Sequence, residues 1–264
     1  VFDLLGKEFF TVPSNQRAYA WAKNNHNRLW SDLKEALDDF RRPGSDKLGH
    51  FLGPVFLIGP GVSEPDNRIK VLDGQQRLTT LSIISSVMVE FVEKHSNEGS
   101  RDNFRAELMD LFSQASRGKR VPRITLDRGQ DEHEQVLLHC NDMRAREDYW
   151  EGSPPRSKPA VAIKEAIGFY HEKIREHLNQ FDSGKELDNA LESLIEVFKE
   201  HLYFLRVKTE NTNAMYKLFE TLNERGLELS QADLVKNITL EFAEKYSKES
   251  LEMAKNDWDD ILDF

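Results

Sequence analysis

The clearest pattern in the chain is an apolar run whose period changes at residues 73 and 74. Residues 69–72, Ile-Lys-Val-Leu, are typical of a short buried strand, and Asp73-Gly74 is a turn signal. Residues 75–93 then carry apolar side chains almost all round a helical projection, which is the pattern of a central, buried helix. The pattern therefore predicts a strand, a sharp turn and a buried helix in direct succession.

Similar patterns predict elements along the rest of the chain. Apolar positions at helical spacing predict helices over residues 26–41, 101–114, 130–139, 160–179, 185–199 and 213–223, with a last helix from residue 231. Short apolar runs bounded by turn signals predict strands over residues 50–59, 68–73, 121–126 and 201–207, and the first two of these form a hairpin. Residues 141–159 contain several Gly and Pro residues, so we expect a boundary there that separates residues 1–140 from residues 141–264.

Polar side chains are concentrated where the buried helix begins, namely Asp73, Gln75, Gln76, Arg77, Thr79 and Thr80. The first N–H groups of a helix lack intrahelical acceptors and, together with the helix dipole, favour a bound anion. Gly74 would let phosphates approach the backbone, Arg77 offers a charged fork for their oxygens, and Asp73 can hold Mg²⁺ or orient a water. In the alternative interpretation Asp73 only caps the helix and Arg77 pairs with a carboxylate.

Two further groups of polar residues lie at predicted element ends. They are Gln16-Arg17 with Tyr19 and Trp21, and Asn223-Glu224-Arg225-Gly226 with Asp233, Lys236 and Asn237. Tyr19 and Trp21 could stack on a planar base, or they could pack on the next helix. The second group could belong to a site, or it could be a helix C-cap followed by an N-cap.

The charge distribution is uneven. The 264 residues have a net charge of −10, which argues against a protein that simply coats nucleic acid. Residues 116–128 nevertheless hold five cations against one acid, and two more arginines follow. These cations are Arg117, Lys119, Arg120, Arg123 and Arg128, then Arg144 and Arg146. The segment is either a face that contacts DNA phosphates or an ordinary solvated surface.

Several classes of protein are disfavoured. The single cysteine, Cys140, excludes an internal disulfide and favours a reducing, cytoplasmic compartment. No apolar run is long enough to span a membrane, and no P-loop, nucleophile-elbow or zinc-protease signature is present. Because the chain begins at Val1 and ends in an amphipathic pattern, we expect further residues on both sides.

Four blocks of residues follow one another in a characteristic order. They are Val12-Pro13 with Gln16-Arg17-x-Tyr19-x-Trp21, then Phe51-Leu52-Gly53, then Leu72-Asp73-Gly74-Gln75-Gln76-Arg77-Leu78-Thr79-Thr80-Leu81, and last the segment from Phe219 through Asn223-Glu224-Arg225-Gly226 to Lys236-Asn237. Together they resemble the N-terminal domain of GmrSD-type (type IV) restriction enzymes, a ParB-like family of phage-defence proteins. The resemblance covers most of the chain. It implies an α+β fold in which a small, mixed, ParB/sulfiredoxin-like sheet with helices is joined to a mainly helical part.

The resemblance also implies nucleotide binding and hydrolysis centred on residues 73–77, with an HNH-type nuclease and foreign, modified DNA as partners. We assign the catalytic roles to Asp73, Gln75, Gln76 and Arg77, with Mg²⁺ held at Asp73. We assign nucleotide binding to Gln16, Arg17, Tyr19, Trp21, Gly74, Thr79, Thr80, Asn223, Arg225, Lys236 and Asn237. The expected function is an NTPase module of a restriction system. The alternative is a non-catalytic nucleotide- or DNA-binding sensor that regulates a partner nuclease.

Overall fold

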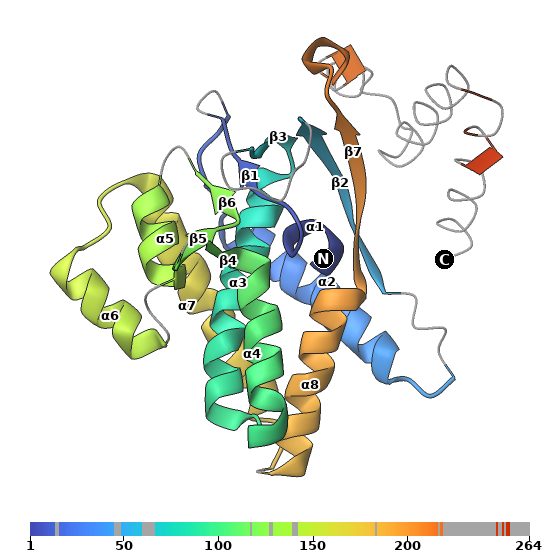
Figure 1. Ribbon diagram of the computed structural model, residues 1–264. Coiled ribbons are helices and arrows are strands. Elements are labelled where there is room, and N and C mark those ends of the chain that lie inside the picture. Colours follow the sequence, from blue (N-terminus) through green and yellow to red (C-terminus); the bar gives the residue numbers. More distant parts are fainter. Residues whose placement is uncertain are drawn as a thin grey trace.

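A five-stranded mixed sheet lies against a group of helices (Figure 1). The computed structural model describes residues 1–13, 16–44, 49–59, 67–116, 118–126, 129–138, 142–182, 184–215, 217–218, 247, 250 and 252–253. The strands of the sheet, in the order in which they pair, are β6 (Ile124–Thr125), β1 (Phe10–Thr11), β3 (Ile69–Asp73), β2 (His50–Ile58) and β7 (Leu202–Thr209). The architecture is thus mixed α/β, and the ParB-like assignment within it stays a prediction.

The sheet combines parallel and antiparallel pairs. β1 runs parallel to both of its neighbours, β2 runs antiparallel to β3, and β7 runs parallel to β2. The predicted hairpin of residues 50–59 and 68–73 is therefore confirmed. The predicted strand over residues 121–126 is divided at Arg123, where β5 (Lys119–Pro122) ends and β6 begins, and β5 forms a separate hairpin with β4 (Ser113–Ser116).

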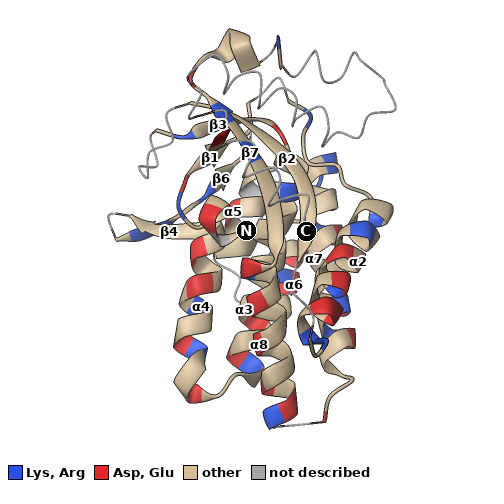
Figure 2. Ribbon diagram, turned by 90° about the vertical axis from the view of Figure 1, so that its right-hand side faces the viewer, with Lys and Arg blue, Asp and Glu red and all other residues tan. Residues whose placement is uncertain are grey.

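The helices are gathered mainly below the sheet in the view of Figure 1. They are α1 (Phe2–Leu5), α2 (Lys23–Arg41), α3 (Gln75–His95), α4 (Glu98–Phe112), α5 (Gln130–Leu138), α6 (Met143–Gly152), α7 (Lys158–Leu178) and α8 (Lys185–Glu200). Acidic and basic residues are spaced along α2, α4 and α8, as the colours of the ribbon show (Figure 2). Within the described ranges, no helix is both long enough and apolar enough to cross a membrane.

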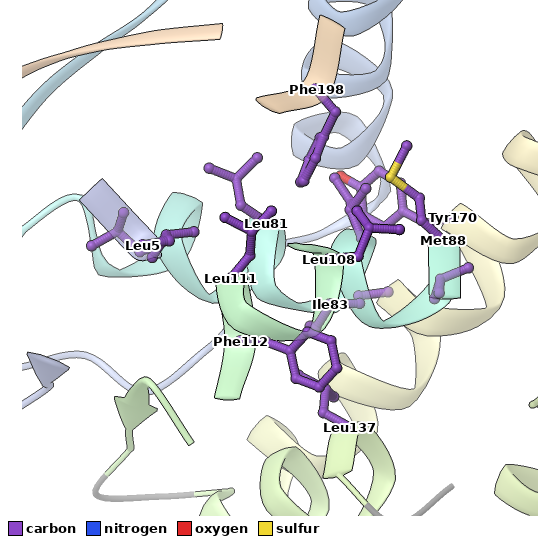
Figure 3. Packing of buried hydrophobic residues seen from close by; sticks show 14 of the residues in the cluster. Leu5, Leu81, Ile83, Met88, Leu108, Leu111, Phe112, Leu137, Tyr170 and Phe198 are labelled. Carbon is purple, nitrogen blue, oxygen red and sulfur yellow. The ribbon is translucent and has the colours of Figure 1, made fainter. Parts of the chain in front are cut away.

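The buried helix α3 is the centre of the core. Its residues from Gln75 to Val92 are buried almost without exception, and it contacts α4, α5, α7 and α8. Figure 3 shows Leu81 and Met88 of α3 among side chains such as Leu108 of α4 and Phe198 of α8. A helix that is apolar all round needs neighbours on every side, as the sequence predicts.

The predicted domain boundary at residue 141 stays a prediction, and buried residues on both of its sides pack together. One cluster of buried residues extends from Leu4 to Leu202, and β7 pairs with β2 in the sheet. The Gly- and Pro-containing segment 141–159 is not a plain linker, because it contains α6. The predicted helices beyond residue 218 lie outside the described residues.

The position of α6 depends on a buried carboxylate in the middle of α3. Glu90 is 1% exposed, and its Oε2 accepts a hydrogen bond from the Met143 N–H at 3.0 Å and lies 3.5 Å from Arg146 Nη1. Its Oε1 contacts His171 Nε2 of α7 at 3.2 Å and Lys94 Nζ at 2.5 Å. Burial alone would raise the pKa of Glu90, but the bonds and charges of His171 and Lys94 outweigh it and lower the pKa to about 2.

We expect Glu90→Gln to destabilise the protein strongly. The variant leaves the buried Arg146 guanidinium without its counter-charge, and loss of one partner of a buried ion pair costs about 3–5 kcal/mol. Glu93→Gln is the matched control, because Glu93 lies on the same helix but pairs with Arg105 at the surface, where such a pair contributes less than about 1 kcal/mol. Urea unfolding measures both free energies, and equal losses in the two variants would contradict this interpretation of the network.

The pH dependence of the same variant provides a second prediction. Because the pKa of Glu90 is lower in the folded protein than its usual value of 4.5, its stabilisation is complete above pH 4.5 and is lost as the pH falls toward 2. The unfolding free energies of wild type and Glu90→Gln should therefore converge over that range. Burial lowers the pKa of His26, His133 and His177 to about 4, so these residues destabilise both proteins between pH 6.5 and 4 and cancel in the difference. A difference that stays constant down to pH 2 would exclude the assignment.

Candidate functional site

The strand–turn–helix at residues 69–81 forms as the sequence predicts. β3 ends at Asp73, Gly74 adopts a left-handed conformation with φ 93°, and α3 begins at Gln75 without a side-chain cap. A Cβ atom at position 74 would lie 3.0 Å from Cγ2 of Val55 on β2. Glycine is therefore required by the turn and by close packing on the sheet. The expected approach of phosphates to the backbone at Gly74 stays a prediction; Val55 occupies the space that a Cβ atom would take.

Three backbone donors where α3 begins have no acceptor within the described part of the chain. The first intrahelical bond runs from the Leu78 N–H to the Gly74 carbonyl oxygen at 3.0 Å. No acceptor among the described residues faces the N–H groups of Gln75, Gln76 and Arg77. With the positive end of the helix dipole, such groups favour an anion.

Gln76 holds the preceding polar segment in place. Its Oε1 accepts a hydrogen bond from the Ala20 N–H at 2.9 Å, and its Nε2 donates to the Ala18 carbonyl oxygen at 3.0 Å. The residues around Arg17 are thereby fastened to the first turn of α3. Both ends of the Gln76 amide thus hold this segment, and the predicted role of Gln76 in positioning a nucleophile stays a prediction.

The side chain of Gln75 differs from that of Gln76 in its hydrogen bonding. Its side chain is 9% exposed, and its Oε1 is buried without a hydrogen-bond partner among the described residues. It lines a narrow pocket with room for about one water molecule. The other lining residues are Val12, Pro13, Gln16, Arg17, Ala18, Tyr19, Gln76, Thr79 and Leu126. The polar members of this pocket were predicted from the sequence, but its apolar wall was not; that wall includes Val12 and Pro13, which follow β1, and Leu126, which follows β6.

Arg77 is directed toward β2 and does not line that pocket. Its Nη1 donates to the Leu52 carbonyl oxygen, its Nη2 donates to the Pro54 carbonyl oxygen at 2.6 Å, and Nη2 lies 3.8 Å from Asp73 Oδ2. Burial lowers the pKa of Arg77, and Asp73 opposes this shift. The predicted pairing of Arg77 with a carboxylate is thus present, although its closer partners are backbone oxygens of Leu52 and Pro54.

Of the two aromatic residues of the N-terminal block, Tyr19 is buried and Trp21 is partly buried. Tyr19 is 3% exposed and hydrogen-bonds Thr80 Oγ1 at 2.8 Å, and burial raises its pKa. Thr80 Oγ1 also donates to the Gln76 carbonyl oxygen at 2.8 Å. Trp21 meets the ring of His26 on α2 edge to face at 5.7 Å. Of the two alternatives for these aromatic residues, packing on the next helix is the one observed.

Only some of the cations of the basic segment are exposed. Arg123 is 4% exposed, donates to the carbonyl oxygens of Gly6 at 2.6 Å and Asp110 at 3.0 Å, and lies over the ring of Phe9 at 4.8 Å. Arg146 is 1% exposed, and its guanidinium is bound by residues of α3. Both expected phosphate contacts are corrected, because neither guanidinium reaches the surface.

The other cations of the basic segment differ from one another. Arg120 donates to Ser113 Oγ at 2.9 Å and pairs with Asp110 at 3.4 Å, so it is partly buried. Lys119 and Arg144 are exposed, the first on the β4–β5 hairpin and the second on α6. The hairpin projects from the body of the molecule (Figure 2). Lys119 and Arg144 are thus the described cations of this set that are free to meet an external anion.

Several predicted site residues lie outside the described part of the chain. They are Asn223, Arg225, Lys236 and Asn237 of the nucleotide site, and Arg117 and Arg128 of the basic segment. In the described ranges, no cluster of three or more His, Cys, Asp or Glu side chains is arranged to hold a metal ion. Asp73, at the end of β3, is the predicted carboxylate that faces the start of α3, and its side chain is 43% exposed.

Two further residues, Gly53 and Glu90, have structural roles that the sequence patterns did not predict. Gly53 was part of a characteristic block but received no role, and the structure places it directly beneath the Arg77 guanidinium. Glu90 is a charged residue within an otherwise apolar helical run, which is the signal that could have revealed its buried network.

Comparison with known protein families gives a match over most of the chain. No curated protein matches the chain. The family described as "GmrSD restriction endonuclease, N-terminal domain" matches residues 1–240, which is most of the 264 residues. The chain therefore belongs to the GmrSD restriction endonuclease N-terminal domain family.

Proposed function

We propose that this chain binds and hydrolyses nucleoside triphosphates as a module of a modification-dependent DNA restriction system. Family membership places the chain in a restriction system, and the rest of the statement is our proposal. One observation carries it. Gln75 lines a narrow pocket and its buried Oε1 has no partner among the described residues, while the N–H groups of Gln75, Gln76 and Arg77 at the start of α3 have no described acceptor either.

Each group has a definite task in this proposal. The N–H groups at the start of α3 bind phosphate oxygens, and the exposed Arg17 side chain adds a positive charge at the rim of the pocket. Gln75 orients the attacking water through Oε1. The water oxygen attacks the terminal phosphorus, the bond from that phosphorus to the bridging oxygen breaks, and the water proton passes to the released phosphate. Positioning and charge stabilisation are the main catalytic contributions to phosphoryl transfer.

Asp73 is suited to hold Mg²⁺ in this site. Mg²⁺ is commonly bound by one or two carboxylates and completes its octahedral shell with waters and substrate phosphates. The half-exposed carboxylate of Asp73, at the strand end that leads into α3, offers such a ligand. When bound, the ion would supply neutralisation of the phosphate charge.

A second candidate function is a nucleotide-binding sensor that does not catalyse. It is favoured by the use of Gln76 and Arg77 within the fold, since their polar groups contact backbone of residues 17–20 and of β2. Fewer groups are then left for chemistry, whereas the N–H groups of α3 suffice for binding. The two functions differ in whether bound nucleotide is turned over.

We expect Gln75→Ala to lower kcat for NTP hydrolysis by about 10²-fold, because the water loses its orienting group. Gln114→Ala is the matched control. Gln114 also has a buried Oε1 without a described partner, but it lies on β4 and does not line the pocket. Phosphate release with each NTP and Mg²⁺ measures the effect. Equal activity of wild type and Gln75→Ala would exclude the assigned role.

A thermal-shift measurement with the same nucleotides separates the two candidate functions. A ligand that binds only the folded state adds about 2.7 kcal/mol of stability at 100 times its Kd. Stabilisation by a nucleotide without phosphate release over hours would replace the NTPase with the sensor. Neither stabilisation nor release with any NTP would exclude both.

Contact with DNA is the other part of the proposal. Among the described cations of the basic segment and α6, Lys119 and Arg144 are exposed, so they are the ones to test. We expect Lys119→Gln and Arg144→Gln each to flatten the slope of log affinity against log salt by about 0.9, since each would remove one phosphate contact. Lys185→Gln is the control, because Lys185 is an exposed lysine at the start of α8. Duplex binding at several salt concentrations gives the slopes. Unchanged slopes in both test variants would assign these residues to an ordinary solvated surface.

A further inference from the structure

The strand that faces the start of α3 contains a bulge at Gly53. In the pairing of β2 with β7, Phe51 lies opposite Tyr203 and Pro54 lies opposite Leu205, so β2 has one more residue than β7 over this interval. Gly53 has φ +94°, a left-handed conformation that other residues adopt at a cost. The extra residue interrupts the regular ladder of hydrogen bonds. The carbonyl oxygens of Leu52 and Pro54 can then accept hydrogen bonds from donors outside the ladder.

Arg77 supplies those donors. Its Nη1 bonds the Leu52 carbonyl oxygen and its Nη2 bonds the Pro54 carbonyl oxygen at 2.6 Å, so the guanidinium spans the bulge. A Cβ atom at position 53 would overlap Nη1 of Arg77. The glycine therefore serves two purposes: it permits the backbone conformation of the bulge, and it leaves room for the guanidinium above it.

The contacts of Arg77 bear directly on the pocket residues. Arg77 belongs to the first turn of α3, as does Gln75, and its guanidinium also lies 3.8 Å from Asp73 at the end of β3. One side chain thus joins the bulge in β2, the end of β3 and the start of α3. If Arg77 turned toward a phosphate, these two backbone oxygens would lose the donors that Arg77 supplies, and a lost hydrogen bond to a buried acceptor is costly.

We propose that Arg77 is a positioning residue that spans the β2 bulge and so fixes Gln75 and the start of α3, and that it does not bind phosphate. This inference rests on the proposed NTPase function for its effect on catalysis. Its structural part, the dependence of Arg77 on Gly53, is independent of any activity. The two parts can therefore be tested by separate measurements.

The first experiment is a double-mutant cycle on stability with Arg77→Ala, Gly53→Ala and the double variant. Residues that act through one contact have non-additive effects. We expect each single substitution to lower the melting temperature, and the double variant to melt close to the less stable single variant. Gly44→Ala is the control for strain alone, because Gly44 also has positive φ (77°) but a Cβ atom there would meet nothing within 4 Å. Gly44→Ala should combine additively with Arg77→Ala, and additivity in the Gly53 cycle would overturn the proposal.

The second experiment separates positioning from phosphate binding. In Arg77→Ala and Gly53→Ala alike, we expect kcat for NTP hydrolysis to fall by about 10²-fold, because misplacement of a catalytic group by about 1 Å is enough for such a loss. KM should change by less than about threefold, since no ground-state contact to the nucleotide is removed. Arg77→Lys should recover little of the rate, because one ammonium group cannot span two carbonyl oxygens as the guanidinium fork does.

The outcomes distinguish this inference from the proposed function. A large rise in KM with unchanged kcat in Arg77→Ala would show that the guanidinium binds nucleotide, and it would overturn the positioning role. Wild type without hydrolysis of any NTP would refute the proposed NTPase and with it the catalytic part of the inference. The stability cycle would still decide whether Arg77 acts through Gly53. If Arg77→Ala does not fold, Arg77→Lys replaces it in the cycle.

Discussion

The burial of α3 on all sides is the constraint on which the rest of the structure depends. A buried polar group on such a helix needs a protein partner in place of water, and several of these partners come from other parts of the chain. Thr80 is hydrogen-bonded to Tyr19, and Gln76 is hydrogen-bonded to the backbone of residues 17–20. Glu90 contacts residues of both α6 and α7. These contacts determine where the segments around α3 lie. The polar residues of α3 thus organise its neighbours, and its apolar residues supply the core.

The same constraint separates the members of the characteristic motif into two kinds. Gln76 and Arg77 are satisfied by backbone groups, and their removal would disturb the fold around the site before any chemistry is considered. Gln75 is the member whose buried oxygen has no partner in the described residues. An unsatisfied buried polar atom is costly, and such atoms are expected at sites that bind a ligand. This contrast is the reason for assigning the chemistry to Gln75 and the geometry to Arg77.

The arginines show that a basic stretch of sequence does not necessarily form an exposed binding surface. Arg123 and Arg146 belong to a markedly basic part of the sequence, yet one lies over the ring of Phe9 and the other is paired with Glu90. Arginine is suited to both situations, because its planar guanidinium can donate several hydrogen bonds and stack on an aromatic ring. The net charge of a segment therefore did not predict which of its cations, such as Lys119, would be exposed.

The sequence by itself determined the features that depend on local patterns. The change of period at Asp73-Gly74 predicted the strand, the turn and the buried helix α3, and four blocks of residues predicted the family. Periodicity and turn chemistry are properties of neighbouring residues, so they can be read directly along the chain. Only the tertiary structure decided which way Gln75, Gln76 and Arg77 point, and that α6 forms within a segment expected to be a boundary. These outcomes depend on partners from distant parts of the chain, such as the bulge in β2 and the carboxylate of Glu90, and no local pattern of residues specifies which distant partners will meet.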